Sequence, residues 1–208
     1  MAEISLPNLR LSFNPDRVWG FNVIVFILLG LLIGINYSFT QEVVVPVSLQ
    51  VQLLMKILLF DRNFKVPKNA ITLGILYQEK YRTSLNIKDE VIRVLNELQT
   101  SEMPAIRIKA KPIPIHDENS LSAALTRDTI HILYVTPLRA IGISAISAIT
   151  RNRKILTFTG VPEYVAEGLG VGIDIKGERP QIIINLNQTK GEGADFSSQL
   201  LNLARVIK

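Results

Sequence analysis

Apolar and polar positions along this 208-residue chain follow two rhythms, one typical of strands and one typical of helices. Compact apolar runs predict strands over 71–77, 106–110, 130–135 and 155–158. Between these runs, apolar residues at helical spacing predict helices over 86–98, 120–125, 137–149 and 161–167. Strands that alternate with helices are typical of right-handed β-α-β crossovers, which produce a mainly parallel sheet with helices on both faces.

The C-terminal region is expected to add an antiparallel element to this sheet. Two apolar runs, 173–175 and 182–186, flank the Gly- and Pro-containing turn 176–180 and predict a β-hairpin. Four apolar residues at helical spacing then predict a C-terminal helix: Leu200, Leu203, Ala204 and Ile207. The predicted fold class is therefore α/β, a single three-layer domain that ends in an antiparallel hairpin plus a helix.

The pattern before residue 41 is that of a targeting segment. An unbroken apolar run covers 23–35, and Arg10 and Arg17 precede it. Ser38 and Thr40 occupy the −3 and −1 positions of a possible cleavage site. This order of a basic region, an apolar region and small residues is typical of a secretory signal.

Thirteen apolar residues are fewer than the roughly 20 that span a bilayer comfortably. Neighbouring apolar residues lengthen the run, so residues 1–40 are interpreted as a cleaved signal peptide or an uncleaved signal anchor, with a buried core helix as the third alternative. In the first two cases residues 41–208 form the α/β domain outside the cytoplasm, and the chain meets a membrane only through an uncleaved anchor.

The first helix after this segment is expected over 49–60, with Ser48 as its N-cap. It is apolar on nearly every side, and the polar exceptions are Gln50, Gln52 and Lys56. A helix that is apolar all round is buried or lies at an interface. This helix is therefore a candidate docking surface, and a homodimer through its apolar face is a further expectation.

Composition excludes several function classes. The net charge is +5, but the cations are spread along the chain, and the closest run is Arg151-Asn152-Arg153-Lys154. A nucleic-acid-binding face concentrates charge and interleaves aromatic residues. Aromatic residues make up only 7% here, so the charges are interpreted as solvated surface and no nucleic-acid partner is expected. The absence of cysteine excludes disulfides, thiolate metal sites and a cysteine nucleophile.

Ligands of such folds favour the crevice at the carboxyl ends of the strands. The polar and glycine residues expected there are Tyr77, Gln78, His116, Asp117, Thr136, Thr159 and Gly160. The cluster His116-Asp117-Glu118 lacks a second well-spaced metal ligand and is interpreted as a loop with an N-cap. His131 is interpreted as a core histidine, and Ser197-Ser198 as a helix cap. No catalytic, phosphate-binding or metal motif is visible, so no catalytic residue, metal or cofactor is predicted.

The C-terminal sequence resembles a known family. Ile184-Asn185-Leu186, followed by the segment 196–206 (FSSQLLNLARV), is similar to the C-terminal signature of the YfiR family. The runs ITLGILY, IHILYV and KILTF are also similar, so the resemblance covers roughly residues 48–207. It implies a small exported regulator that represses an inner-membrane diguanylate cyclase by acting on its periplasmic part, and so a role in cyclic-di-GMP signalling.

This sequence departs from the family pattern in three places. The redox-linked cysteines are absent, so thiol sensing is not carried over. The aromatic end of the first helix is replaced by 60–63 (FDRN), and the usual Asp-x-Pro-Gly-Phe loop appears as 159–164 (TGVPEY). The first helix and this loop are the expected partner or ligand surface. Its candidate residues are Leu49, Leu53, Lys56, Phe60, Arg62, Thr159, Gly160, Pro162, Glu163 and Tyr164.

The leading hypothesis is a periplasmic, non-enzymatic regulator. It would bind and repress an inner-membrane signalling protein, either a diguanylate cyclase or a sensor kinase, through that protein's periplasmic domain. The alternative is a periplasmic small-molecule binding module that holds its ligand at the strand ends and feeds a sensor or a transporter. An enzyme is the third reading, and it lacks a visible nucleophile–base pair.

Overall fold

The computed structural model describes residues 45–65, 70–100, 107–177 and 179–208. Its seven strands form one sheet in the order β2-β1-β3-β4-β5-β6-β7. The strands are β1 (Ile71–Tyr77), β2 (Ile108–Pro114), β3 (Ile132–Val135), β4 (Leu156–Thr159), β5 (Val171–Lys176), β6 (Arg179–Asn185) and β7 (Arg205–Ile207). The helices are α2 (Val47–Leu58), α3 (Arg82–Thr100), α4 (Glu118–Arg127), α5 (Ile143–Arg153), α6 (Pro162–Ala166), α7 (Leu186–Gly191) and α8 (Ser198–Leu203).

The sheet is mainly parallel, as the alternation of strands and helices predicts. Strands β2, β1, β3, β4 and β5 are parallel neighbours. Strand β6 turns back antiparallel to β5, and β7 runs parallel to β6. The α/β fold class with a C-terminal antiparallel hairpin is confirmed.

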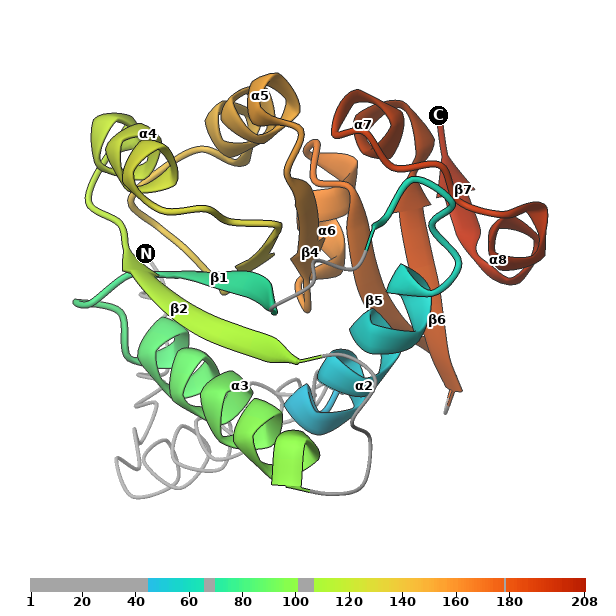
Figure 1. The fold of residues 1–208 in the computed structure, drawn as a ribbon, viewed down its shortest axis with the longest axis horizontal. Helices are drawn as coiled ribbons and strands as arrows, with labels where there is room; N and C mark the ends of the chain where they lie inside the picture. The colour runs from blue at the N-terminus through green and yellow to red at the C-terminus, as the bar shows by residue number, and fades with distance from the viewer. Residues whose placement is uncertain (1–44, 66–69, 101–106, 178) are drawn as a thin grey trace, which may run out of the picture. The chain divides into compact units, whose positions relative to one another are not determined.

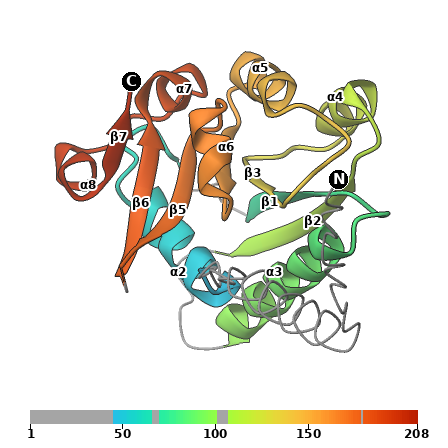
Figure 2. The same cartoon turned by 180° about the vertical axis from the view of Figure 1, so that it is seen from behind.

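Two apolar cores cover the two faces of the sheet. Helices α2 and α3 pack on one face, where the core includes Leu54, Val91 and Phe158. Helices α4 and α5 pack on the other face with Leu121 and Ile146. Figures 1 and 2 show this division, with α2 and α3 together on one side of the sheet and α4, α5 and α7 in a row on the other. The three-layer prediction is therefore confirmed.

The hairpin forms where its turn residues predict it. Lys176 pairs with Arg179, so the turn between β5 and β6 has two residues. Gly177 has a φ of 65°, in the left-handed region that glycine adopts without strain. Strand β1 also has the predicted bounds, 71–77.

Strand β2 shows that one boundary prediction was wrong. Pro112 and Pro114 were expected to follow a strand ending at 110, but β2 runs through both. It lies at the outer edge of the sheet, where one side of the strand has no neighbour and a missing N–H breaks no ladder. The charged Lys109 and Lys111 on the same strand also discourage edge-to-edge pairing.

Three helix starts were also placed wrongly. Helix α3 begins at Arg82, before the predicted start at 86. Helix α2 begins at Val47 after Pro46, so Ser48 lies inside the helix and is not its cap. Helix α5 begins at Ile143, and the residues from Pro137 to its start form a loop. Two backbone N–H groups of that loop donate to the Gln78 side chain, which fixes it in a non-helical path.

The C-terminal helix is shorter than its apolar spacing predicts. Helix α8 ends at Leu203, and Ala204 is extended with φ −98° and ψ 155°. Val206 and Ile207 then pair with β6 as strand β7. Pairing with the open edge of β6 satisfies backbone groups that one more helical turn would leave unpaired. The short helix α7 was not predicted, because its sequence, LNQTKG, carries no apolar period.

The N-terminal targeting prediction, residues 1–40, lies outside the described residues. Within the described part of the chain, no helix combines the length and the apolar character that crossing a membrane requires. The described residues, from Val45 to Lys208, belong to one compact unit.

Candidate functional site

The outer face of α2 carries a stripe of half-buried and exposed residues at helical spacing, three of which are predicted site residues. The inner side of the helix buries Val51, Leu54 and Ile57 against the sheet. Outward lie the half-buried Leu49 and Leu53, the exposed Gln52 and Lys56, and Leu59, which is 67% exposed. We call these five residues the α2 face. The expectation of a helix that is apolar all round is only partly met, because this face mixes apolar and polar side chains.

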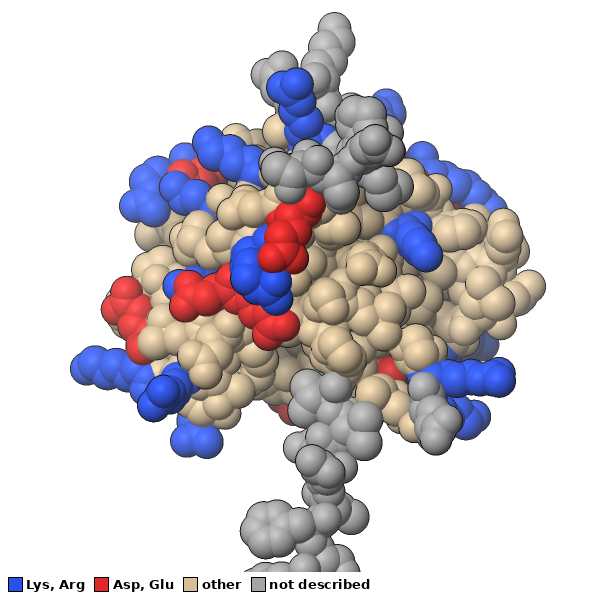
Figure 3. Space-filling model, turned by 90° about the horizontal axis from the view of Figure 1, so that it is seen from below, with Lys and Arg blue, Asp and Glu red and all other residues tan. Residues whose placement is uncertain are grey.

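Lys56 is the one charged residue among the five of the α2 face. Figure 3 shows charged side chains gathered over α3 and a broad, largely uncharged area beside them over α2. The charges on α3 pair with one another, as in the Arg93–Glu97 ion pair at 2.6 Å. Apolar surface bordered by charged residues is typical of a protein-interaction site.

A buried glutamine fixes the start of α2 to the sheet. The Gln50 amide donates to the Val45 carbonyl oxygen at 2.7 Å, and its carbonyl oxygen accepts from the Tyr134 hydroxyl. Burial raises the pKa of Tyr134, so this hydroxyl stays a donor at physiological pH. In the sequence Gln50 was only a polar exception in an apolar helix. That exception was the signal for a buried polar anchor.

The 159–164 loop lies beside this anchor. A Cβ added to Gly160 would overlap the Gln50 side chain, so the backbone of the loop and the start of α2 are in close contact. The structure therefore brings together the two segments that the sequence proposed as one surface, although more than a hundred residues separate them.

Thr159 and Tyr164 are held by hydrogen bonds within the fold and do not form part of the α2 face. Thr159 is buried, and its hydroxyl donates to the Val135 carbonyl oxygen at 2.9 Å. The Tyr164 hydroxyl accepts from the Leu138 N–H at 2.9 Å and donates to the Leu138 carbonyl oxygen at 3.2 Å. Burial raises the pKa of Tyr164. Pro162 starts α6, and Glu163 is the exposed candidate in this loop.

We expect Gly160→Ala to displace the start of α2. The added methyl group has no room beside Gln50, so either the helix or the loop must move, at a cost of about 1–3 kcal/mol in the free energy of unfolding. Chemical denaturation measures this change, and Gly142→Ala is the matched control. Its added methyl meets only the Ser144 hydroxyl at an ordinary contact distance of 3.7 Å. Equal effects of the two substitutions would contradict the close contact.

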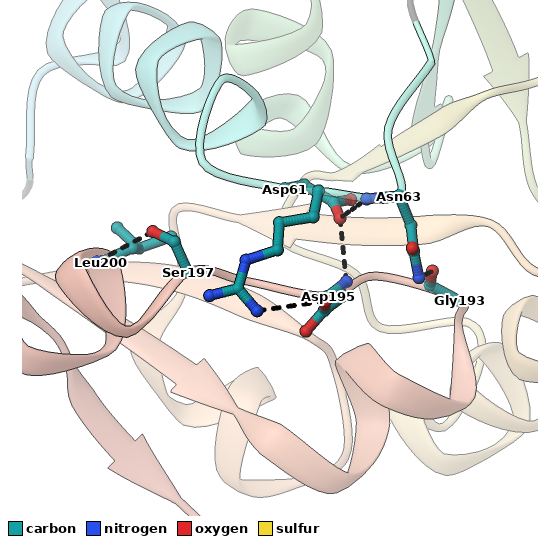
Figure 4. A network of polar contacts seen from close by, with 7 residues as sticks. Asp61, Asn63, Gly193, Asp195, Ser197 and Leu200 are labelled. Carbon is teal, nitrogen blue, oxygen red and sulfur yellow. Dashed lines mark hydrogen bonds and ion pairs between the residues drawn. The ribbon is translucent and has the colours of Figure 1, made fainter.

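The end of α2 is fixed to the C-terminal region. Residues 60–63 pair with residues 193–197 (Figure 4), and we call this pairing of the two segments the clasp. The Asp61 carboxylate accepts from the backbone N–H groups of Asp195 at 2.8 Å and Asn63 at 3.0 Å. The Phe60 carbonyl oxygen accepts from Ser197 N–H at 2.9 Å.

The clasp gives structural roles to residues that the sequence assigned to partner binding. Phe60 is half-buried and packs against the core. Arg62 is exposed and makes an ion pair with Asp195 at 3.4 Å. No pattern in the sequence links positions 61 and 195, because the pairing joins segments far apart in the chain.

The carboxyl ends of β1 and β3 lie next to each other in the sheet. Here the strand order reverses, because β2 lies on one side of β1 and β3 lies on the other. The chain's own polar groups fill this point. Ser84 and Thr136 hydroxyls lie 2.6 Å apart, and the Gln78 carbonyl oxygen accepts from the N–H groups of Arg139 at 2.8 Å and Ala140 at 3.2 Å. The Arg139 guanidinium also lies 4.3 Å from the centre of the Tyr81 ring.

The remaining polar candidates act as caps or core partners. Asp117 is the N-cap of α4 and forms a capping box with Ser120, as its loop interpretation predicts. The His131 ring accepts from the Thr72 N–H at 3.0 Å. Ser197 caps α8. No group of three metal-ligating side chains occurs within residues 45–65, 70–100, 107–177 and 179–208.

Comparison with known proteins places the chain by family and by fold. A family model described as YfiR/HmsC-like matches residues 64–205. A search of curated proteins found no match.

Three solved structures share the fold. A conserved domain protein from Vibrio cholerae O1 biovar El Tor has a TM-score of 0.57 at 13% identity, over 78% of this chain and 60% of that one. CD0873 from Clostridium difficile is a substrate binding protein with adhesive properties, solved in a ligand-free, open form. Its TM-score is 0.53 at 18% sequence identity, over 79% of this chain and 60% of that one. An ABC domain in complex with L-Trp from Streptococcus pneumonia has a TM-score of 0.54 at 15% sequence identity, over 78% of this chain and 60% of that one. This chain therefore spans less than two thirds of each of these proteins.

Proposed function

Because this chain belongs to the YfiR/HmsC-like family, we propose that it is a non-enzymatic repressor of an inner-membrane signalling protein. Its family is regulatory and periplasmic. The protein it represses would carry a periplasmic domain and a diguanylate cyclase or sensor kinase output, and the α2 face would bind that domain.

The observation that carries this proposal is the α2 face itself. Leu49, Leu53 and Leu59 offer apolar contact area next to the charged surface of α3. Both ends of the helix are fixed, at its start by Gln50 and at its end by the clasp. A preorganised helix face loses little conformational entropy when it binds, which favours affinity. Apolar area with a polar rim is the usual composition of a protein interface.

The test places charge on the α2 face. In cells that carry this chain and a candidate membrane signalling protein, deletion of the chain should raise cyclase or kinase output. Reintroduced wild type should restore repression. The double variant Leu53→Glu with Lys56→Glu should repress at least about tenfold less than wild type, because a charge buried without a partner disfavours binding. Output is measured as cellular cyclic-di-GMP or as kinase phosphorylation.

The matched control for this test changes charge on the neighbouring helix. Arg82→Glu alters an exposed residue of α3 and should leave repression intact. Thermal unfolding establishes that each variant is folded. Repression by the α2 variant equal to that of wild type would reject the α2 face, and deletion of the chain without any change in output would reject the regulatory function.

Small-molecule binding is the second candidate function. The observation that favours it is the Arg139 guanidinium, which is exposed and stacked on Tyr81 at the carboxyl ends of β1 and β3. One structure of similar fold is titled as a substrate binding protein, and another as a complex with L-Trp. Calorimetric titration with free amino acids tests this function. Binding that Arg139→Gln weakens at least tenfold would support it, and no detectable heat with wild type would reject it.

A further inference from the structure

A group of cations lies at the C-terminal end of α5 and on the adjacent α7. Arg151, Arg153 and Lys154 form the end of α5 and its cap, and Lys190 lies on α7. The Lys154 ammonium group donates to the Gly191 carbonyl oxygen at 2.7 Å, which brings the two helix ends together. Figures 1 and 2 show α4, α5 and α7 side by side on the same face of the sheet. We call these four residues the α5–α7 cationic surface.

Neutral acceptors hold the three cations at the end of α5 in place. The Arg151 guanidinium donates twice to the Gln188 carbonyl oxygen, at 3.1 and 2.7 Å. Arg153 donates to the Thr126 hydroxyl at 2.6 Å and to the Ser122 carbonyl oxygen at 3.2 Å. Among the described residues none of the four cations makes an ion pair with a carboxylate. The positions of Arg151, Arg153 and Lys154 are therefore fixed while their charge is left unneutralised.

Two carboxylates on neighbouring segments, Glu192 and Asp128, are engaged with other partners. Glu192 is 2% exposed, and its oxygens accept from Thr157, Thr150 and Gln188 in the interior. Asp128 pairs with Lys111 at 3.4 Å and with Arg127 at 3.3 Å. The dipole of α5 stabilises cations at its C-terminus, which accounts for part of their placement but supplies no neutralising charge.

We propose that the α5–α7 cationic surface binds an acidic segment of a partner protein. Guanidinium groups held in a fixed orientation match carboxylates with two parallel hydrogen bonds, and complementary charge speeds and orients association. The sequence interpretation of this run as solvated surface does not explain why neutral groups fix each cation on α5.

The cationic surface and the start of α2 lie at opposite ends of β4. Arg153 and Lys154 lie just before the amino end of β4. The described chain begins at Val45, which bonds to Gln50 beside Gly160, at the carboxyl end of β4. The cationic surface is also distinct from the α2 face, so it does not rest on the function proposed above.

Fluorescence anisotropy with the full chain and a labelled decaglutamate peptide tests the proposal. We expect the peptide to bind in 20 mM salt and its affinity to fall at least tenfold in 200 mM salt. Added salt screens the charges and shortens the distance over which they attract each other. Lys154→Glu with Lys190→Glu should weaken it at least tenfold, and the milder Lys154→Gln with Lys190→Gln about threefold. Thermal unfolding checks that both variants are folded.

The matched control reverses two cations on the hairpin, Lys176→Glu with Arg179→Glu, and should change the affinity less than twofold. Three results would overturn the proposal: no binding of the peptide by wild type, equal loss in the control and the test variants, or binding to phosphatidylglycerol vesicles without binding to the peptide. The last result would assign the surface to a lipid headgroup.

Discussion

Glu192→Ala is expected to lower the free energy of unfolding by about 3 kcal/mol. Four donors converge on this buried carboxylate: the N–H and hydroxyl of Thr157, the Thr150 hydroxyl and the Gln188 amide. Each hydroxyl can rotate to another acceptor, but the Thr157 N–H is fixed in a strand and loses its partner. Leaving such a donor buried and unsatisfied costs about 1–3 kcal/mol, and the cavity left by the side chain adds to it.

Chemical denaturation at neutral pH measures this loss. Glu167→Ala is the matched control, because Glu167 is an exposed carboxylate at the end of α6. Its replacement should change the free energy of unfolding by about 0.5 kcal/mol or less. A similar loss in both variants would mean that the buried network contributes nothing beyond surface charge.

The same carboxylate gives the protein a pH dependence with a definite sign. Burial raises the pKa of Glu192 above its usual 4.5, although hydrogen bonds from Gln188, Thr157 and Thr150 lower it in part. The folded protein therefore holds this proton more tightly than the unfolded chain. The pH-dependent part of the stability from this group is fully present below pH 4.5 and is lost as the pH rises through the folded pKa, whereas the hydrogen bonds of its side chain contribute separately.

Comparison with Glu192→Gln isolates this contribution, because glutamine does not titrate. The free energy of unfolding of wild type relative to the variant should fall as the pH rises from 4.5 toward 8. A pH-independent effect of the glutamine amide changes the difference in the free energy of unfolding by the same amount at every pH. It therefore leaves the pH dependence of that difference unchanged. A difference that stays constant, or that grows with pH, would show that the hydrogen bonds outweigh burial.

Asp61→Ala is expected to open the clasp and to lower the free energy of unfolding by about 2–3 kcal/mol. The carboxylate accepts two backbone N–H bonds, and each hydrogen bond to a charged group contributes about 1.5–3 kcal/mol before the chain relaxes. Hydrogen exchange should accelerate most at the amides of Asp195 and Ser197, which the clasp protects.

Arg62→Gln is the internal comparison for the clasp. It removes only the exposed ion pair with Asp195, which contributes about 0.2–1 kcal/mol. If the two substitutions cost the same, the buried Asp61 carboxylate is not what holds the two segments together. The comparison also separates the clasp from partner binding, because Arg62 alone of the two side chains is exposed.

The clasp and the Gln50 anchor together explain how the α2 face stays in position. One end of the helix is bonded to Tyr134 in the centre of the sheet, and the other end is paired with the C-terminal segment. The family-like C-terminal signature therefore does more than close the fold. Through Asp195 and Ser197 it fixes the end of the helix whose outer face we propose as the partner surface.

The sequence by itself determined the elements whose stability is local or whose burial is nearly complete. The run 71–77 is apolar throughout, so no solvent-facing alternative competes with a central strand. Gly177 permits the left-handed turn between β5 and β6, and Asp117 with Ser120 defines the start of α4. In each case the determining contacts span a few residues, and the family resemblance depends on the same local patterns.

Only the tertiary structure decided the rest, because it depended on what lies beside each segment. An apolar period over 200–207 fits a helix, but the open edge of β6 makes a strand of its last residues. The prolines of β2 are tolerated because that strand lies at an edge. The pairing of Asp61 with Asp195, the contact of Gly160 with Gln50 and the inward turn of Glu192 join distant segments. No sequence period records such contacts, since they arise from packing between elements and not from the preference of any one of them.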